Sequence, residues 1–453
     1  MLIATNPYTG QKIAEYPSLT GRQIGDCIGD AFSAFDRWKN TDIGARANIL
    51  NNIAVELREH KEILAKLMAE EMGKPITEGR AEVEKAAWCA EHYAEHAQSY
   101  LAEQVIESDA GKSYVCFQPL GTLLGILPWN APLWIAFRYL APALMAGNTC
   151  VMKHDPNVPG CAQALTDIFI KARVPNGVMV NLPVETPEVE LAIRDPRISA
   201  ISFTGSSAAG KKVAAMAASE LKPAVLELGG SDPCVVLADA DLEQAASVAV
   251  LSRIINAGQS CIAAKRIIVD KQVYAEFIEL AKAKLSALKL GDPLDESTQV
   301  GPLARKDLQQ NLHRQVQESI EAGANCLLGG ELPEEDGYFY PVTLLTDVTP
   351  QMTVFKEETF GPVMVVIQAD NPEHALQLAN QTDYGLGGAV WSQDTSAAEA
   401  FALKINSGQV AINGIVKTDP RLPSGGIKNS GYGRELGPHG IKEFVNAKQV
   451  WIK

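Results

Sequence analysis

Residues 201–213 read ISFTGSSAAGKKV, in which a short apolar run leads through a glycine turn into a segment with the composition of a helix. Strand, turn and helix in this order are typical of a sheet of parallel strands that carries helices on its faces. Gly205 and Gly210 permit a close approach of the backbone, and the first turn of a helix offers unpaired N–H groups to an anion. The stretch therefore predicts either a phosphate-binding turn or an ordinary strand-to-helix connection.

Short apolar runs of the same kind lie on both sides of this stretch. Five alternate with helical segments in the first series: residues 122–127, 149–152, 177–181, 198–203 and 224–228. A second series follows Ser231, with runs at 266–269, 362–367 and 387–391 and a helix at 274–288. The pattern predicts two α/β domains, between which the chain crosses near residues 228–231. A crevice between two such domains is where a dinucleotide and a substrate would meet.

The region before the first series is mostly helical. Thr20 is a suitable cap for a helix whose apolar residues recur at helical spacing, namely Ile24, Ile28, Phe32, Phe35 and Trp38. Two more long helices are expected, at residues 43–72 and 76–101.

Composition narrows the possible classes of protein. The 453 residues are 46% hydrophobic and 21% charged, as in ordinary globular proteins, and their net charge of −14 argues against a broad nucleic-acid surface. The first ten residues lack the features of a secretory signal, and the apolar stretch 132–147 is short and interrupted by Arg138. The eight cysteines form no CxxC pair. We expect reduced thiols and a cytoplasmic location.

Three segments contain residues suited to chemistry. LELGGS at 226–231 puts Glu227 at the end of an apolar strand, where a carboxylate is costly to bury unless it has a partner or a role. NAGQSCIAAKR at 256–266 puts Cys261 in a small polar loop, unlike a buried inert thiol. PWNAP at 128–132 holds Asn130 in a turn between two prolines. A paired structural carboxylate, a chance thiol and a turn asparagine are the alternatives.

Two further motifs suggest other functions. GSSAAGKK matches a Walker A loop up to its last position, where Lys212 replaces the Ser or Thr that would bind magnesium, so a P-loop-like nucleotide hydrolase is a weak alternative. His92, Glu95 and His96 match the zinc motif H-x-x-E-H, although the surrounding run also fits a solvated helix face. We therefore expect no metal site.

Taken in order, seven segments resemble the aldehyde dehydrogenase superfamily across essentially the whole chain. They are PWNAPLW at 128–134, VMK at 151–153, FTGS at 203–206, LELGG at 226–230, GQSC at 258–261, EETFGPV at 357–363 and GGIKNSGYGRELG at 425–437. Within it, the chain is most similar to the short succinate-semialdehyde dehydrogenases of the Sad type, which share LELGGSDP and the AAKR after the cysteine.

The resemblance implies an aldehyde dehydrogenase fold with three parts. These are a Rossmann-like coenzyme domain at 1–110 and 124–229, an α/β catalytic domain at 230–424, and a β oligomerisation arm at 111–123 and 425–453. A homodimer or homotetramer is expected by the same analogy.

In such an enzyme Cys261 would be the nucleophile, Glu227 would activate water, and Asn130 would hold the oxyanion. The implied coenzyme is NAD or NADP. Its implied contacts are Trp129, Lys153, Pro156, Gly205, Ser206, Gly210, Leu228, Glu358 and Phe360. Relatives that prefer NAD often have a glutamate at the position of Pro156, and its absence here predicts that both coenzymes are accepted.

The implied substrate is a small aldehyde, with succinate semialdehyde first. Arg138 lies where such enzymes have an arginine that binds the distal carboxylate, and Thr418 matches a substrate-binding serine. Two positions depart from the pattern, since Ile255 replaces a second arginine and Ser424 replaces an aromatic residue. Arg421 or Lys417 would then supply the missing charge. A structural ion pair is the alternative role for Arg138.

Overall fold

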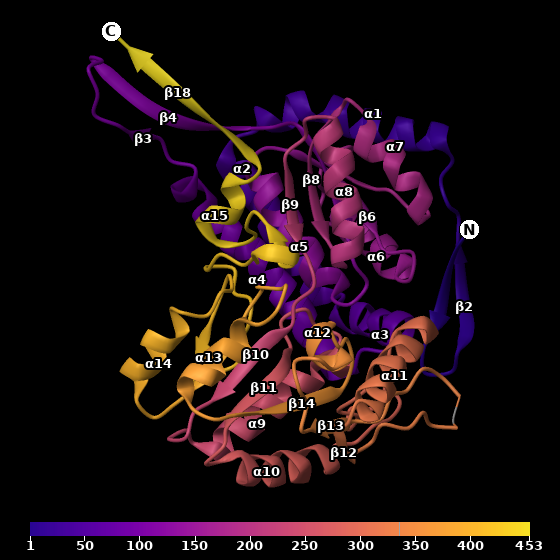
Figure 1. The fold of residues 1–453 in the computed structure, drawn as a ribbon. Coiled ribbons are helices and arrows are strands. Elements are labelled where there is room, and N and C mark those ends of the chain that lie inside the picture. The colour runs from indigo at the N-terminus through magenta and orange to yellow at the C-terminus, as the bar shows by residue number, and fades with distance from the viewer. Residues whose placement is uncertain (335) are drawn as a thin grey trace.

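The computed structural model describes residues 1–334 and 336–453. It has two lobes, each built on its own sheet, and an arm that extends from the first lobe beside the C-terminus (Figure 1). The predicted α/β class is confirmed, because nearly all neighbouring strands of the two large sheets are parallel and helices pack against them.

The first lobe contains a six-stranded sheet in the order β17-β9-β8-β5-β6-β7. Its strands are β5 (Thr122–Leu127), β6 (Thr149–His154), β7 (Met179–Asn181), β8 (Ile198–Thr204), β9 (Ala224–Glu227) and β17 (Gly431–Tyr432). All five predicted runs form strands. β17 is antiparallel to β9 and comes from the C-terminal part of the chain.

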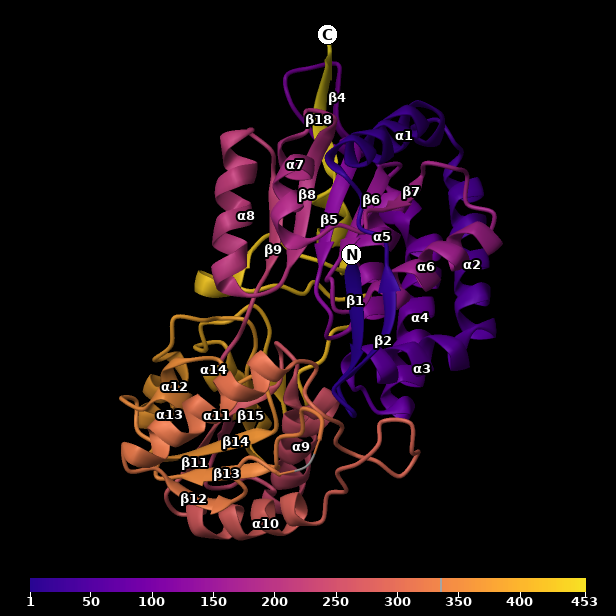
Figure 2. The ribbon, with the colours of Figure 1, turned by 90° about the vertical axis from the view of Figure 1, so that its right-hand side faces the viewer.

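Helices cover both faces of this sheet (Figure 2). One face packs on α1 (Gly21–Lys39), α7 (Val189–Arg194) and α8 (Ser207–Ser219) through an apolar cluster that includes Ile28 and Phe203. The other face packs on α5 (Pro132–Met145) and α6 (Pro159–Lys171), and α2 (Ile43–Glu59) and α4 (Ile76–Tyr100) pack against these helices. Because both faces are buried, the strands are apolar throughout rather than alternating.

The helix predicted over residues 43–72 is wrong in one respect. The predicted helix is divided at His60 into α2 and α3 (Lys61–Met72), because the backbone of His60 is not helical. The backbone N–H of His60 still donates to the carbonyl oxygen of Glu56, so the two helices follow one another without a loop. Both helices pack on α4. The predicted first helix is confirmed as α1, with Thr20 and Gln23 forming a capping box, although Phe32 is exposed.

The second lobe contains a seven-stranded sheet in the order β12-β13-β14-β11-β10-β15-β16. Its strands are β10 (Asp232–Val236), β11 (Ala264–Asp270), β12 (Asn325–Leu328), β13 (Thr343–Thr346), β14 (Val363–Ala369), β15 (Ala389–Trp391) and β16 (Ala411–Ile412). Its helices are α9 (Leu242–Ile254), α10 (Tyr274–Ser286), α11 (Lys306–Glu321), α12 (Thr353–Lys356), α13 (Pro372–Asn380) and α14 (Thr395–Ala402).

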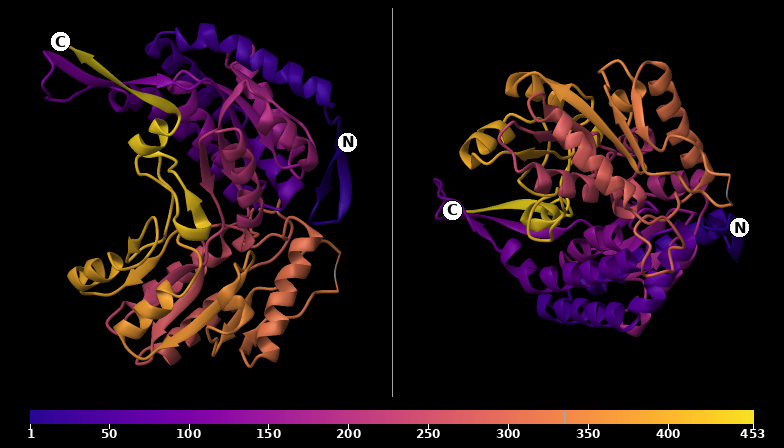
Figure 3. Two further views of the ribbon diagram at one scale, coloured as in Figure 1. Left: turned by 45° about the horizontal axis from the view of Figure 1, so that its top comes forward. Right: turned by 90° about the horizontal axis from the view of Figure 1, so that it is seen from below.

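Two smaller sheets complete the fold. β1 (Leu2–Asn6) and β2 (Gln11–Tyr16) form a hairpin, and β3 (Gln104–Val105), β4 (Lys112–Pro119) and β18 (Val445–Ile452) form the arm. The arm projects away from both lobes in two further views (Figure 3). A short helix, α15 (Gly437–Lys442), precedes β18. None of the helices in the described residues is both long and apolar enough to cross a bilayer.

Candidate active site

A cleft with a volume of about 440 Å³ lies where the carboxyl ends of β5, β6, β8 and β9 face the second lobe. Ligands bind at this end of parallel strands in open α/β sheets, and the volume is that of an ordinary ligand site. Ten of the predicted site residues line the cleft: Trp129, Asn130, Lys153, Gly205, Ser206, Glu227, Leu228, Cys261, Glu358 and Phe360.

The loop that presents Cys261 has an unusual backbone. It follows a 3₁₀ turn (Ile255–Gly258) in which Asn256 and Ala257 have φ angles of 55° and 52°, a conformation that side chains rarely adopt. Gly258 has a φ of 74°, and a Cβ there would lie 2.3 Å from the carbonyl oxygen of Gly361. The loop thus passes too close to its neighbour for any residue but glycine. It turns sharply out of α9 and brings Cys261 to the cleft.

The electrostatic surroundings of Cys261 favour the neutral thiol. Burial raises the pKa of Cys261 to about 11, and the charges of Glu227 and Glu358 raise it further, against the opposite effect of Arg138 and Lys265. The thiolate, not the thiol, is the nucleophile, so this cysteine needs a base when it reacts. A thiol activated in advance by a lowered pKa is not what the structure contains.

Asn130 lies in the loop between β5 and α5. Its Nδ2 donates to the carbonyl oxygen of Gln259 at 3.0 Å, two residues before Cys261. The backbone carbonyl oxygen of Asn130 accepts from Lys74 Nζ at 2.9 Å and from Asn256 Nδ2 at 2.8 Å. The amide is therefore fixed against the cysteine loop, and Nδ2 has a second proton with which to bind an oxyanion.

Glu227 ends β9 and is buried. Arg138 Nη2 donates to its Oε2 at 2.8 Å, whereas its Oε1 has no hydrogen-bond partner among the described residues. The same Nη2 of Arg138 also contacts Glu435. Burial raises the pKa of Glu227, although Arg138 opposes this effect. The result is a carboxylate that is held through one oxygen and is more basic than usual at the other.

The two residues after Glu227 are glycines because a side chain at either position would collide with its neighbours. A Cβ at Gly229 would lie 2.3 Å from Glu358 Oε2, and one at Gly230 would lie 2.9 Å from the carbonyl oxygen of Cys261. The backbone N–H of Gly230 donates to Glu358 Oε1 at 3.1 Å. The LELGG segment thus passes between the cysteine loop and Glu358 and keeps both near Glu227.

The rest of the cleft fits a dinucleotide. Lys153 is buried at the end of β6 and forms no ion pair with any described residue, and burial lowers its pKa. Ser206 caps the 13-residue helix α8, whose first N–H groups face an incoming anion. Phe360 packs edge-to-face on Trp129, with ring centroids 5.8 Å apart. A free cation, a helix N-terminus and an aromatic pair suit a ribose, a pyrophosphate and a ring, respectively.

Two residues predicted to contact the coenzyme do not line the cleft. A Cβ at Gly210 would lie 2.5 Å from Leu228 Cδ2, so this glycine is required for packing α8 on β9. Pro156 follows β6 in a turn, and its neighbour Asp155 lines the cleft instead.

The three predicted substrate residues all have partners within the chain. Arg138 is 2% exposed and lies between Glu227 and Glu435, which matches the alternative of a structural ion pair. Arg421 forms two hydrogen bonds with Asp419, at 2.8 and 2.6 Å, and its side chain is 65% exposed. Thr418 is buried and accepts hydrogen bonds through its hydroxyl.

Sequence reasoning missed three charged residues at this site. Glu435 shares Arg138 with Glu227, and burial raises its pKa to about 7. Lys265 is fully buried, pairs with Glu358 and donates to the carbonyl oxygen of Cys261. Lys85 donates to Thr418. Glu435 lies in GRELG and Lys265 lies in AAKR, so both could have been found because they belong to motifs of the family. Lys85 belongs to none of the motifs.

The motifs that suggested other functions have structural explanations. Lys212 is exposed on α8, and the hydroxyl of Ser206 is used to cap the helix, so no Walker A site is formed. His92 Nε2 lies 3.1 Å from the hydroxyl of Tyr100, and its ring packs edge-to-face on His96. Among residues 1–334 and 336–453, no group of three or more His, Cys, Asp or Glu could hold a metal.

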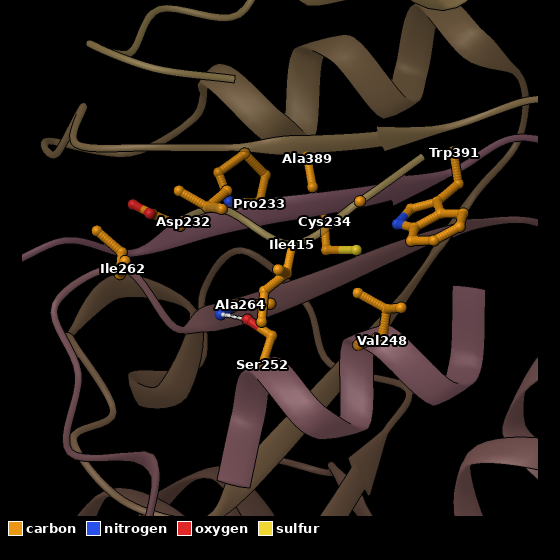
Figure 4. A pocket seen from close by; sticks show the side chains of 13 residues that line it. Asp232, Pro233, Cys234, Val248, Ser252, Ile262, Ala264, Ala389, Trp391 and Ile415 are labelled. Carbon is orange, nitrogen blue, oxygen red and sulfur yellow. Dashed lines mark hydrogen bonds between the residues drawn. The ribbon is translucent and has the colours of Figure 1, made fainter. Parts of the chain in front are cut away.

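A second cavity, between α9 and the β10, β11 and β15 strands, is too small for a ligand (Figure 4). Its volume is about 10 Å³, which is no more than one water molecule needs. Cys234, Val248 and Trp391 line it, and Ser252 accepts from the N–H of Ala264 at 3.0 Å. This cavity is a packing defect of the second lobe.

These features are those of a class of protein, the oxidoreductases built on two α/β lobes, and they bring a thiol, an amide donor and a carboxylate together in one cleft. More particularly, the chain belongs to the aldehyde dehydrogenase family, whose sequence pattern matches residues 2–450. The predicted family, fold and enzyme class are confirmed.

Individual relatives are similar over their whole length. The chain is 43% identical to "Succinate-semialdehyde dehydrogenase [NADP(+)] 1" of Mycobacterium tuberculosis, with 100% of both chains covered. It is 43% identical to "Succinate semialdehyde dehydrogenase [NAD(P)+] Sad" of Escherichia coli, covering 99% of this chain and 97% of the relative. The solved succinic semialdehyde dehydrogenase of Streptococcus pyogenes with NADP⁺ is 34% identical, with full coverage of both chains and a TM-score of 0.98.

Proposed function

We propose that the protein oxidises succinate semialdehyde to succinate with NAD or NADP. The observation that carries this proposal is the convergence of Cys261, Asn130 and Glu227 in one cleft with the predicted coenzyme contacts. The names of the full-length relatives support the substrate and the coenzymes.

In the first half of the proposed reaction, Cys261 attacks the aldehyde carbon. Because the thiol is neutral, Glu227 takes its proton as the sulfur–carbon bond forms and the carbonyl π electrons move to oxygen. Asn130 Nδ2 and the backbone N–H of Cys261 bind the resulting oxyanion. Removing one such donor typically costs about 10²–10³ in rate.

The bound coenzyme would supply a hydride acceptor, which converts the thiohemiacetal on Cys261 to a thioester. Glu227 must first release the thiol proton to solvent. It then takes a proton from water through its Oε1 as the water oxygen attacks the thioester carbon. The carbon–sulfur bond breaks, the sulfur of Cys261 takes the proton back from Glu227, and the product leaves as a carboxylic acid. Arg138 keeps Glu227 in place through Oε2 and leaves Oε1 available.

Lys153, Ser206 and Glu358 would hold the coenzyme, with Phe360 packed on its nicotinamide end. Acceptance of NADP is supported by Lys153, which has no ion-pair partner among the described residues, and by the absence of a carboxylate at Pro156. Asp155 opposes a 2′-phosphate in part, which favours use of both coenzymes.

We also propose the three-part organisation expected from the sequence, with a coenzyme domain, a catalytic domain and an oligomerisation arm, and a cytoplasmic location. Exposed apolar side chains on the arm support assembly into a dimer or tetramer. They are Val105, Ile106, Trp451 and Ile452.

The proposed function is tested by the absorbance of reduced nicotinamide after mixing the protein with succinate semialdehyde and either NAD or NADP. A rise in absorbance with stoichiometric formation of succinate is expected. Flat traces with both coenzymes, while an uncharged aldehyde is oxidised, would exclude the proposed substrate and leave the reaction class.

A further inference from the structure

The proposed substrate carries a carboxylate at the end opposite its aldehyde group, and a buried carboxylate needs a cation. Both arginines predicted to bind it already have acidic partners in the chain. Arg138 contacts Glu227 and Glu435, and Arg421 is paired with Asp419. A further cation near Cys261 must therefore be sought on other elements.

Lys85 on α4 is a candidate, because it contacts Thr418, whose position matches a substrate-binding serine. The side chain of Lys85 is half-buried and forms no ion pair with any carboxylate that the structure describes. Its Nζ lies 4.2 Å from the ring centroid of Trp134 and donates to Thr418 Oγ1 at 2.9 Å. An ammonium group has three protons, so at least one remains for an incoming anion.

Like Lys85, Thr418 has a proton that can be donated to an anion. Its Oγ1 accepts from Lys85 Nζ and also from Trp134 Nε1 at 3.0 Å. These two bonds use both lone pairs of the hydroxyl oxygen, and its proton is left as a donor. Lys85 and Thr418 thus present two adjacent donors, which fit the two oxygens of a carboxylate.

The fold ties this pair of donors to the reacting centre. Glu82, one helical turn before Lys85, accepts from the backbone N–H groups of Leu133 and Trp134 at 2.8 and 3.1 Å. Lys74 pairs with Glu82 and donates to the carbonyl oxygen of Asn130. Glu82 and Lys74 therefore hold the Asn130 loop and the start of α5, the helix that carries Trp134.

Electrostatics agree with an anion-binding role. Burial lowers the pKa of Lys85 to about 8, and the charge of Arg138 lowers it further, while Glu82, Cys89 and Asp419 act in the opposite direction. Arg138 also affects the pKa of Cys261, so both side chains lie within its field. A carboxylate beside Lys85 would offset the unfavourable burial of its charge.

We propose that Lys85, together with Thr418, binds the distal carboxylate of the substrate and determines the preference for a carboxylated aldehyde. This inference rests on the proposed function. It replaces the expected arginine clamp with a lysine that reaches the site from α4.

The test compares succinate semialdehyde with butanal, which has the same chain length but no carboxylate, for wild type, K85M, K85R, K417M and K66M. The expected result is that K85M lowers the ratio of the two kcat/KM values by roughly 10- to 100-fold through KM, because a charged hydrogen bond is lost. K85R should recover part of the ratio. K417M, which removes a competing exposed lysine, and K66M, which removes a surface lysine on α3, should keep the wild-type ratio.

Each other outcome has a distinct meaning. If K85M keeps the wild-type preference for succinate semialdehyde, Lys85 does not bind the carboxylate, and the proposed function still stands. If K417M loses this preference instead, Lys417 supplies the charge that binds the carboxylate. If wild type shows no preference, the proposed substrate fails. Inhibition of butanal oxidation by succinate then tests Lys85 directly, since a constant inhibition constant in K85M would overturn its role.

The pH dependence of the wild-type protein provides a second test of Lys85. The kcat/KM ratio for the two aldehydes reports the free enzyme, so it should fall above pH about 8 as Lys85 loses its proton. K85R should keep a constant ratio to higher pH, because arginine stays charged. A wild-type ratio that is independent of pH between 7 and 10 would contradict the proposal.

Discussion

On the coenzyme side of Cys261 the cleft is formed largely by the strand ends and turns of a single sheet, whereas on the aldehyde side the proposed contacts come from three separate segments. Lys153 lies near the end of β6, and Ser206 lies in the turn after β8. Lys85, Trp134 and Thr418 come from α4, from α5 and from the loop after β16. The coenzyme site is thus a property of local backbone structure, and the substrate site is a property of long-range packing.

The two sides also differ in the state of their charges. Lys153 faces the cleft without an ion-pair partner in the described chain, while Arg138 on the aldehyde side is already neutralised by two glutamates. A shared architecture can therefore keep the coenzyme site constant and change the aldehyde site by a few side chains. We expect a substitution on one side to leave the binding properties of the other side largely unchanged.

The largest effect is expected from Cys261→Ala. Loss of the nucleophile should reduce turnover of every aldehyde by on the order of 10⁴-fold or more, while coenzyme affinity stays within about twofold. Absorbance of reduced nicotinamide and coenzyme titration by protein fluorescence measure the two quantities. Cys27→Ala, at a half-buried thiol on α1, is the matched control. Full turnover by the Cys261 variant would exclude the proposed mechanism.

Glu227→Gln should reduce steady-state turnover by about 10²–10⁴-fold, because water is no longer activated. If the main role of Glu227 is in hydrolysis, rapid mixing should reveal a burst of reduced coenzyme that approaches the number of active sites. Mass spectrometry of the quenched protein should detect an acyl group on Cys261. Slow turnover without a burst would instead place the principal role of Glu227 in activation of the thiol.

Much of the coenzyme side could be predicted from the sequence because its signals are local. ISFTGSS specifies a strand, a turn and a helix cap within seven residues, and Gly205 and Ser206 do line the cleft. Gly210 was assigned to the coenzyme for the same reason, although its actual contact is Leu228 on the next strand. Spacing alone does not distinguish a ligand from a packing partner.

The aldehyde side was harder to predict because its contacts join distant parts of the chain. Arg138 inside an apolar helix correctly implied an anion, but the sequence did not reveal that Glu227 and Glu435 are that anion. Lys85 lies in a run of charged residues on α4, which is typical of a solvated helix face. Its contacts with Trp134 and Thr418 in the folded chain distinguish Lys85 from a surface lysine.

A change on the coenzyme side should leave aldehyde choice intact. Lys153→Met is expected to raise the KM for NADP by roughly 10- to 100-fold, because a charge-assisted contact is lost, with a smaller effect on NAD. The kcat/KM ratio of succinate semialdehyde over butanal at saturating coenzyme should not change. A change in that ratio would show that the two sides are coupled rather than independent.

The smallest effect is expected from Arg421→Met. Arg421 is largely exposed and its charge is neutralised by Asp419, and such surface pairs contribute little. The KM for succinate semialdehyde should therefore change by less than about threefold, as measured beside K85M under the same conditions. An increase of tenfold or more that is specific to the carboxylated aldehyde would move the carboxylate site toward the rim of the cleft. Asp419 would then be the residue that holds Arg421 ready for substrate, and Lys85 would be left with the role of supporting Thr418.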